Sequence, residues 1–406
     1  MRILVVTSCF YPDTYAVNDI VRRFVERGHE VTVLTGLPDY TTSRIPEEYQ
    51  HGQNRHQDYY GADVRRVPTV ARRHGPFWRS LSYLSFARNG RRAALHGTWK
   101  EFDVIYVWQV SPVTMGIPAI AFKKRFGRPI FLYCMDIWPE CIKAMGFHEG
   151  SPFFSAVGRV SRKVYQACDR IAVSSMPFLD YLEETDGCDR SRMCYLPQYG
   201  SGELLKDDFA KQPDGHTDFL FIGNVGKVQD MGCLLRAAAA VSERGRDFTI
   251  HIVGGGSELE NSKKLAEQLH LQEKVLFYGP KPFKEATGFY RKADACLLTL
   301  EGRDRIGETL PGKLQTYMAA GKPVLGAING AGRQVIEESG CGACVPAGDA
   351  GGLSQLFISY LDAPEKFSEC GEKGRKYFRE NFSEERFFEE TEKQLALLIA
   401  KNGTKH

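Results

Sequence analysis

Residues 308–328 read ETLPGKLQTYMAAGKPVLGAI, a run that joins an acid, a Pro-Gly turn, a short helical pattern and an apolar strand. A glycine turn that opens a helix beside a strand end leaves backbone N–H groups free, and the helix dipole adds positive potential there. Such a turn is a natural anion site. An ordinary strand–turn–helix unit with a surface acid has the same pattern, so the rest of the chain must decide.

Apolar runs of strand length alternate with helical patterns on both sides of this stretch, which predicts parallel sheets joined by crossover helices. Strands are expected at 3–7, 31–35, 104–108, 130–135 and 171–174, and then at 219–222, 248–253, 275–278, 295–300, 324–328 and 343–346. A connection rich in Pro and Gly, 196–217, separates the two sets. The predicted fold class is therefore α/β, with two Rossmann-like doubly wound parallel-sheet domains facing a central cleft.

Composition is that of a globular protein: 406 residues, 43% hydrophobic, 25% charged, with a net charge of +3, so nothing points to nucleic acid. The eleven scattered cysteines favour reduced thiols over a disulfide framework, and the lone C-x-x-C, 341–344, is a weak metal signal. The apolar start of the chain is too short for a signal peptide, and no apolar run could span a membrane. A cytoplasmic protein is expected, free or attached to the inner face of the cell membrane.

Glycine turns follow two successive strands in the second half. The first contains Gly223, Asn224, Gly226 and Lys227, and the second contains Gly254 to Gly256. Small residues let a backbone approach a phosphate, although a tight strand–helix turn would look alike. Neither turn is the G-x-G-x-x-G of a dinucleotide fold. Together with 308–328, the two turns predict a nucleotide-diphosphate site.

In the first half, Asp136 and Glu140 follow the buried strand 130–135. An acid at a strand's carboxyl end can act as a base or bind a substrate hydroxyl, whereas Asp before a turn is also a common helix cap. We interpret Asp136 as functional and Glu140 as structural.

Residues 72–92 combine aromatic and apolar residues with arginines, and residues 61–100 hold nine Arg or Lys against one acid. Phe77, Leu81 and Leu84 share a helical face, and Arg88 and Arg92 lie beyond it. The segment from Arg72 to Arg92 therefore predicts a surface for anionic lipid or an acidic acceptor. A helix packed in the core with a solvated basic end is the alternative.

At this point the chain resembles a glycosyltransferase of family 4, with the GT-B architecture. The motifs that carry the resemblance cover nearly its whole length: Ile3-Leu-Val-Val-Thr with Tyr11-Pro-Asp, Arg27-Gly-His-Glu-Val, Asp136-Ile-Trp-Pro-Glu, Phe221-Ile-Gly-Asn-Val-Gly, Tyr317-Met-Ala-Ala-Gly-Lys-Pro-Val and Asn381-Phe-Ser-Glu-Glu. Two of the segments are most similar to the branch that builds bacterial surface polysaccharides, including N-acetylfucosamine-type transferases. The expected domains are residues 1–203 for the acceptor, 204–382 for the nucleotide-sugar donor, and a helix in 383–406 that returns to the first.

The family's paired glutamates fall here on Glu308 and Thr316, so the second acid is missing. By resemblance Glu308 contacts the transferred sugar, and Thr316 takes the place of the acid that holds the ribose, with a weaker contact. Asn224 and Gln229 stand where the family commonly has Arg and Lys. The predicted donor site consists of Gly223, Asn224, Gly226, Lys227, Gln229, Gly254, Gly255, Arg305, Thr309, Gly312, Lys313 and Thr316.

The resemblance implies a retaining, metal-independent transfer of a sugar, an N-acetylated hexosamine or deoxyhexosamine, from a UDP-sugar. Asp136 and Glu308 are the predicted catalytic residues, and Tyr11, Tyr15 and Ser111 the acceptor-binding ones. The nucleotide sugar is a co-substrate, so no cofactor and no metal are expected. The expected acceptor is a sugar linked to polyprenyl diphosphate at the membrane surface.

Three other classes of protein share an α/β fold of this kind and are alternatives to a glycosyltransferase. An NAD-dependent oxidoreductase needs a glycine fingerprint after the first strand, and residues 7–13 lack it. A non-catalytic nucleotide-sugar-binding protein of the same fold and a UDP-sugar epimerase both stay open, the first because Thr316 departs from the acid pair.

Overall fold

The computed structural model describes residues 1–39, 43–73, 75–302 and 309–403, which fall into two compact units. The N-terminal unit comprises Met1–Leu196 together with the residues from Glu390 onward, and the C-terminal unit comprises Pro197–Glu389. The expected boundaries at 203/204 and 382/383 lie seven residues away from these two limits. The chain therefore crosses between the units twice.

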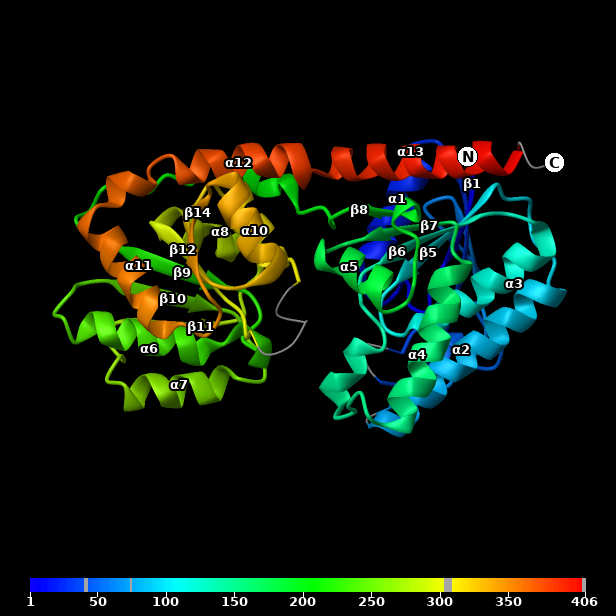
Figure 1. Ribbon diagram of the computed structural model, residues 1–406, viewed down its shortest axis with the longest axis horizontal. Coiled ribbons are helices and arrows are strands. Elements are labelled where there is room, and N and C mark those ends of the chain that lie inside the picture. The colour runs from blue at the N-terminus through cyan, green and yellow to red at the C-terminus, as the bar shows by residue number, and fades with distance from the viewer. Residues whose placement is uncertain (40–42, 74, 303–308, 404–406) are drawn as a thin grey trace. The chain divides into compact units, whose positions relative to one another are not determined.

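The described strands of the N-terminal unit form an eight-stranded sheet in the order β3-β4-β2-β1-β5-β6-β7-β8. Strands β1, β5, β6, β7 and β8 of this sheet are labelled in Figure 1. All neighbours are parallel except β3 and β4, which pair antiparallel. The strands are β1 (Arg2–Val6), β2 (Glu30–Thr35), β3 (His56–Tyr59), β4 (Ala62–Arg66), β5 (Val104–Gln109), β6 (Ile130–Cys134), β7 (Arg170–Val173) and β8 (Met193–Tyr195).

Helices cover both faces of this sheet, because alternate residues of a strand point to opposite sides. On one face Phe24 packs edge-on to Tyr106 at 5.5 Å, and on the other Phe86 and Val164 join a cluster with Val107. The helices are α1 (Ala16–Glu26), α2 (Pro76–His96), α3 (Ile117–Phe126), α4 (Pro152–Ala167), α5 (Pro177–Glu184) and the last part of α13 (Glu384–Gly403).

Helix α13 ends within the N-terminal unit, where half-buried ion pairs attach it to the residues that follow α1. The Glu392 carboxylate accepts from Arg27 at 2.8 and 3.1 Å and pairs with His29 Nε2 at 2.8 Å. Near its end, Asn402 Nδ2 donates to the Gly127 carbonyl oxygen at 2.9 Å. These contacts join the end of the chain to the unit that holds its beginning.

The described strands of the C-terminal unit form a six-stranded parallel sheet in the order β11-β10-β9-β12-β13-β14. They are β9 (Asp218–Ile222), β10 (Thr249–Val253), β11 (Val275–Gly279), β12 (Ala295–Thr299), β13 (Val324–Ala327) and β14 (Gly342–Val345). Phe219 and Phe221 face a cluster with α6 and α11, while Leu220 faces one with α8, α9 and α10. The helices are α6 (Met231–Ser242), α7 (Leu259–Gln268), α8 (Phe283–Lys292), α9 (Gly312–Ala319), α10 (Gly330–Ser339), α11 (Ala350–Asp362) and α12 (Cys370–Asn381).

The predicted α/β class with two parallel-sheet domains is confirmed, and the predicted strands lie within a few residues of the observed ones. Strands β3, β4 and β8 were not predicted. Strand β3 reads HQDY and β4 reads ADVRR, so neither is an apolar run. No helix in the described part of the chain is long and apolar enough to cross a membrane.

Candidate functional site

The two glycine turns of the C-terminal unit pack directly on each other at the ends of β9 and β10. Gly254 has φ 150°, and a Cβ there would lie 1.8 Å from the Gly223 carbonyl oxygen. Gly256 has φ 155°, and its Cβ would lie 2.3 Å from the Val225 carbonyl oxygen. No other residue fits so close an approach, so contact between the loops already accounts for these two glycines.

The first turn also holds its polar side chains within itself. Gln229 Oε1 accepts from the Gly226 N–H at 3.0 Å and from Asn224 Nδ2 at 3.1 Å. These two residues stand where a cationic pair was the family expectation, and the structure shows them bracing the loop. Lys227 is exposed and makes no ion pair with any residue that the structure describes. It is thus an exposed positive charge in the first glycine turn.

Helix α9 begins at Gly312 after Pro311, and no side chain caps it. Leu314 N donates to the Pro311 carbonyl oxygen at 3.0 Å. The N–H groups of Gly312 and Lys313, which precede it, have no partner among the described residues and are available as donors. Tyr317 fixes the helix to the end of β9, because its hydroxyl accepts from Ile222 N at 3.1 Å and lies 3.3 Å from Ile222 O. The helix start therefore keeps a set position beside the first glycine turn.

Lys313 is the most unusual group of this region. Its Nζ is buried, lies 3.8 Å from the centre of the Phe221 ring, and has no hydrogen-bond partner among the described residues. Removal from water disfavours the charged form and lowers the Lys313 pKa from 10.5 to about 7. Its Cε lies 3.4 Å from where a Cβ of Gly223 would stand, so the lysine lies against the glycine turn. No carboxylate of the described residues pairs with this buried amine, as in an anion site before its ligand binds.

Thr316 lies one turn further along α9, and its Oγ1 donates to the Gly312 carbonyl oxygen at 3.2 Å. The oxygen keeps lone pairs that can accept from a ligand hydroxyl. Thr309 is half-buried just before the helix. Glu308 and Arg305, which the sequence also assigned to this site, lie outside the described residues.

The N-terminal unit contains a separate pocket of about 210 Å³ at the carboxyl ends of β1, β2, β5 and β6. It brings together Tyr15, Ser111 and Asp136, three of the residues expected to act on the acceptor. Ser111 Oγ donates to Asp136 Oδ2 at 2.7 Å and accepts from Trp138 Nε1 at 3.2 Å. The Asp136 carboxylate is thus oriented by Ser111 at the wall of the pocket.

Tyr11 does not line this pocket. Its side chain is 46% exposed and packs on Tyr59 with ring centres 5.2 Å apart. Glu140 is buried, accepts from the Tyr181 hydroxyl at 3.0 Å and pairs with Lys143 at 2.6 Å, which is a structural role.

Two further residues line the pocket: Asp39, which was not predicted to bind the acceptor, and Arg72, which begins the segment predicted to meet anionic lipid or an acidic acceptor. Asp39 Oδ2 accepts from Arg72 N at 2.6 Å, and Asp39 N donates to Asp13 Oδ2 at 3.1 Å. Burial raises the Asp39 pKa from 3.8 to about 6. Asp39 follows the end of β2 as Asp136 follows the end of β6, so the strand-end criterion could have found it. The pocket therefore offers two carboxyl groups and a guanidinium to a polar ligand.

Metal-ligand geometry is not seen in either unit: the described residues contain no group of three or more His, Cys, Asp or Glu side chains that could hold an ion.

Comparisons with known proteins match one family to each unit. The family described as Glycosyl transferase 4-like domain matches residues 14–198, and the family described as Glycosyl transferases group 1 matches residues 206–377. Two parallel-sheet units that carry these two matches define a glycosyltransferase of the GT-B class. Within that class, the chain belongs to the family 4-like glycosyltransferases.

Curated relatives match at low identity. The putative colanic acid biosynthesis glycosyl transferase WcaI of Escherichia coli (strain K12) is 23% identical over 340 residues, 79% of this chain and 82% of WcaI. The putative colanic acid biosynthesis glycosyltransferase WcaL of the same strain is 25% identical over 182 residues, only 44% of this chain and 45% of WcaL. Among solved structures, Anabaena HepE in complex with UDP has a TM-score of 0.70 at 14% identity, over 98% of this chain and all of that one. At this identity the structural likeness shows the fold alone.

Proposed function

We propose that the protein is a retaining glycosyltransferase that moves a sugar from a UDP-sugar to a sugar acceptor in polysaccharide biosynthesis. The buried, unpartnered Lys313 beside the first glycine turn is the observation that carries the proposal. A nucleotide diphosphate supplies the missing negative charge at the point where α9 presents free N–H groups. Gly223, Gly312 and Lys313 then hold the diphosphate, and Thr316 meets the ribose.

Sugar chemistry also fits the N-terminal pocket. Sugar hydroxyls are donors and acceptors at once, and the Asp136 carboxylate, the Asp39 carboxyl group and the Arg72 guanidinium provide both kinds of partner. Transfer of this kind requires no metal in our proposal, because positive groups of the chain stabilise the leaving diphosphate. Glu308 contacts the transferred sugar, which we propose to be an N-acetylated hexosamine or deoxyhexosamine.

The relatives support this choice of substrates. WcaI and WcaL are named for colanic acid biosynthesis, and the Erwinia amylovora relative AmsK for amylovoran biosynthesis. HepE was solved with UDP and with UDP-glucose. A mannosyltransferase of Mycolicibacterium smegmatis that depends on GDP-mannose is also a relative, so a guanine nucleotide is the main competitor as donor.

We propose further that the acceptor is linked to polyprenyl diphosphate and reached at the inner membrane surface through α2. The residues predicted to share one face of this helix are exposed: Phe77 is 70%, Leu81 36% and Leu84 60% accessible. Phe86 and Ala94 of the same helix pack in the core, as the alternative expected, so the exposed apolar face belongs to a helix anchored through other residues. The rest of the helix carries Arg79, Arg88 and further arginines, and no acid. An apolar face with a basic flank suits a surface of anionic lipid.

The test is a thermal-shift panel of UDP, GDP, ADP and TDP on the full chain. Because a ligand that binds only the folded state raises its stability, UDP should raise the Tm most. Slow hydrolysis of a UDP-sugar should accompany it. Equal shifts with all four nucleotides, or none, would refute the donor assignment. UDP binding without any hydrolysis or transfer would favour the non-catalytic protein, and release of an isomerised UDP-sugar the epimerase.

A further inference from the structure

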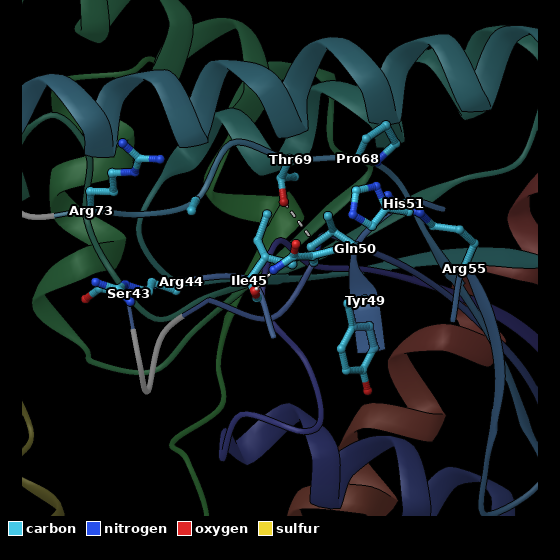
Figure 2. A pocket seen from close by; sticks show the side chains of 12 residues that line it. Ser43, Arg44, Ile45, Tyr49, Gln50, His51, Arg55, Pro68, Thr69 and Arg73 are labelled. Atoms are coloured by element: carbon cyan, nitrogen blue, oxygen red, sulfur yellow. Dashed lines mark hydrogen bonds between the residues drawn. The ribbon is translucent and has the colours of Figure 1, made fainter. Parts of the chain in front are cut away.

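A second, larger pocket in the N-terminal unit has no role in the function proposed so far. Its volume is about 1200 Å³, and it lies among the residues that follow β2 and β4 (Figure 2). Four of its lining residues are cationic or can become so, namely Arg44, His51, Arg55 and Arg73. None of the described lining residues is an acid. The described lining therefore presents positive side chains and no negative one to a ligand.

The cations occupy both ends of the pocket. Figure 2 shows Arg44 and Arg73 at one end and His51 and Arg55 at the other. The Arg73 guanidinium stacks on the Trp78 ring at 4.6 Å, which leaves its edge N–H groups for hydrogen bonds. A ligand with more than one anionic oxygen suits such a spread of donors.

Arg55 is the pocket cation whose charge has no partner among the described residues. Its Nη1 is buried and has no hydrogen-bond partner among the described residues, and Arg55 forms no ion pair with them. Burial lowers the Arg55 pKa. Arg66 nearby is the opposite case, because it donates to the Gly36 carbonyl oxygen and to Gln57 Oε1, both at 3.1 Å. A buried guanidinium N–H without a partner is costly unless a ligand accepts from it.

The position of the pocket indicates which part of a ligand enters it. Leu37 and Thr69 line both this pocket and the smaller one that contains Asp136, so the two adjoin. The wall between residues 67 and 71 is attached to α2, because Val70 N donates to Ser85 Oγ at 2.9 Å and Asn89 Nδ2 to Pro68 O at 2.7 Å. The basic pocket thus lies next to both the sugar-sized pocket and the helix with the exposed apolar face.

We propose that this basic pocket binds the phosphate or diphosphate group that joins the acceptor sugar to its lipid, with Arg55 as the principal ligand. The proposal rests on the proposed function, because it assigns the neighbouring pocket to the acceptor sugar. Arg55 is a binding and specificity residue for the acceptor, and takes no part in donor binding.

The first test is calorimetric titration of the full chain with inorganic pyrophosphate. Saturating UDP is present throughout, so that the donor site is closed to the probe. Arg55→Gln should weaken pyrophosphate binding at least about tenfold, the size expected for a lost charge-assisted pair, and Arg55→Lys should recover part of it. Arg379→Gln is the matched control, because Arg379 is exposed in the C-terminal unit and its removal changes net charge equally. Unchanged pyrophosphate affinity in Arg55→Gln would overturn the proposal.

A second arm distinguishes a lipid-borne diphosphate from a free one, with farnesyl diphosphate as the probe. Tighter binding of farnesyl diphosphate than of pyrophosphate, lost in Arg55→Gln, supports the lipid-linked acceptor. Equal affinity of the two probes would overturn the lipid part of the proposal. As a control for folding, UDP should raise the Tm of Arg55→Gln as much as that of the wild type. An equal rise shows that the donor-binding unit of the variant is folded. Failure of UDP to stabilise the wild type would instead refute the proposed function.

Discussion

Binding of UDP should draw a proton into the protein at Lys313. In the free protein the Lys313 pKa is about 7, so at pH 8 only about a tenth of the lysine is charged. A diphosphate against the ammonium favours the charged form and returns the pKa toward its ordinary 10.5. The complex therefore takes up about 0.9 proton at pH 8 and about half a proton at pH 7.

Isothermal titration in two buffers of different ionisation enthalpy measures this uptake directly. The preferred pH is 8, because the terminal phosphate of UDP is by then already ionised and contributes little. UDP affinity should also fall by about tenfold for each pH unit between 8 and 10, since each complex consumes nearly one proton. Lys313→Met should abolish the uptake, and Lys227→Gln should keep it because Lys227 is exposed. Uptake near zero in the wild type, or equal uptake in Lys313→Met, would refute the role of Lys313.

The same lysine should make the ligand-free protein less stable than it could be. A lysine pKa lowered from 10.5 to about 7 means that folding disfavours the charged form. The cost is complete below pH 7, about 5 kcal/mol for the whole shift, and it disappears as the pH rises through 10.5. Lys313→Met should therefore raise the free energy of unfolding by up to about 4 kcal/mol at pH 7 and by less than about 1 kcal/mol at pH 10.

Three further outcomes follow from the geometry. Gly254→Ala should lower the free energy of unfolding by more than about 2 kcal/mol and remove the rise in Tm with UDP, because its Cβ would overlap the facing loop. Gly255→Ala should lower the free energy of unfolding by less than about 1 kcal/mol, because the nearest atom to its Cβ is 3.5 Å away. The stability of Asp39→Asn relative to the wild type should increase as the pH rises from 4 to 6, by about 3 kcal/mol in total, because burial disfavours the ionised Asp39 carboxylate in the folded wild type. Urea unfolding at several pH values measures this difference in free energy, and a difference that does not change with pH would contradict the prediction. The double change of Phe77 and Leu84 to Ser should reduce sedimentation with phosphatidylglycerol vesicles and leave the rise in Tm with UDP unchanged, whereas undiminished sedimentation would contradict the membrane role of this face.

Most of the fold could be predicted because its central strands are buried on both faces and read as apolar runs. Strand β5 is buried at every position, and its limits were predicted to within a residue. Strands β3 and β4 were missed because they are not buried on both faces and so are not apolar runs. They form an antiparallel pair at the sheet edge, where alternate residues face water, so only the pairing itself reveals them.

Parts of the candidate sites could be predicted from the sequence, and other parts could not. Asp136 could be predicted because a strand end is visible in sequence, and the same criterion applied to β2 leads to Asp39. The basic pocket could not be predicted, because its charge comes from separate loops that only the fold brings together. Whether Arg55 or Arg66 has spare donors depends on carbonyl oxygens contributed by other segments.

The glycine turns show how a correct location can have a different cause from the one assumed. Glycine was expected there to admit a phosphate, yet Gly254 and Gly256 are required by the carbonyl oxygens of the neighbouring loop. The cations expected in the first turn are replaced by Asn224 and Gln229, which brace that loop and bring no charge. Since Thr316 is also neutral, the described donor region depends for its charge on Lys313 and Lys227. Of these two only Lys313 is buried, so the energy of nucleotide binding should be concentrated at the diphosphate and not at the ribose.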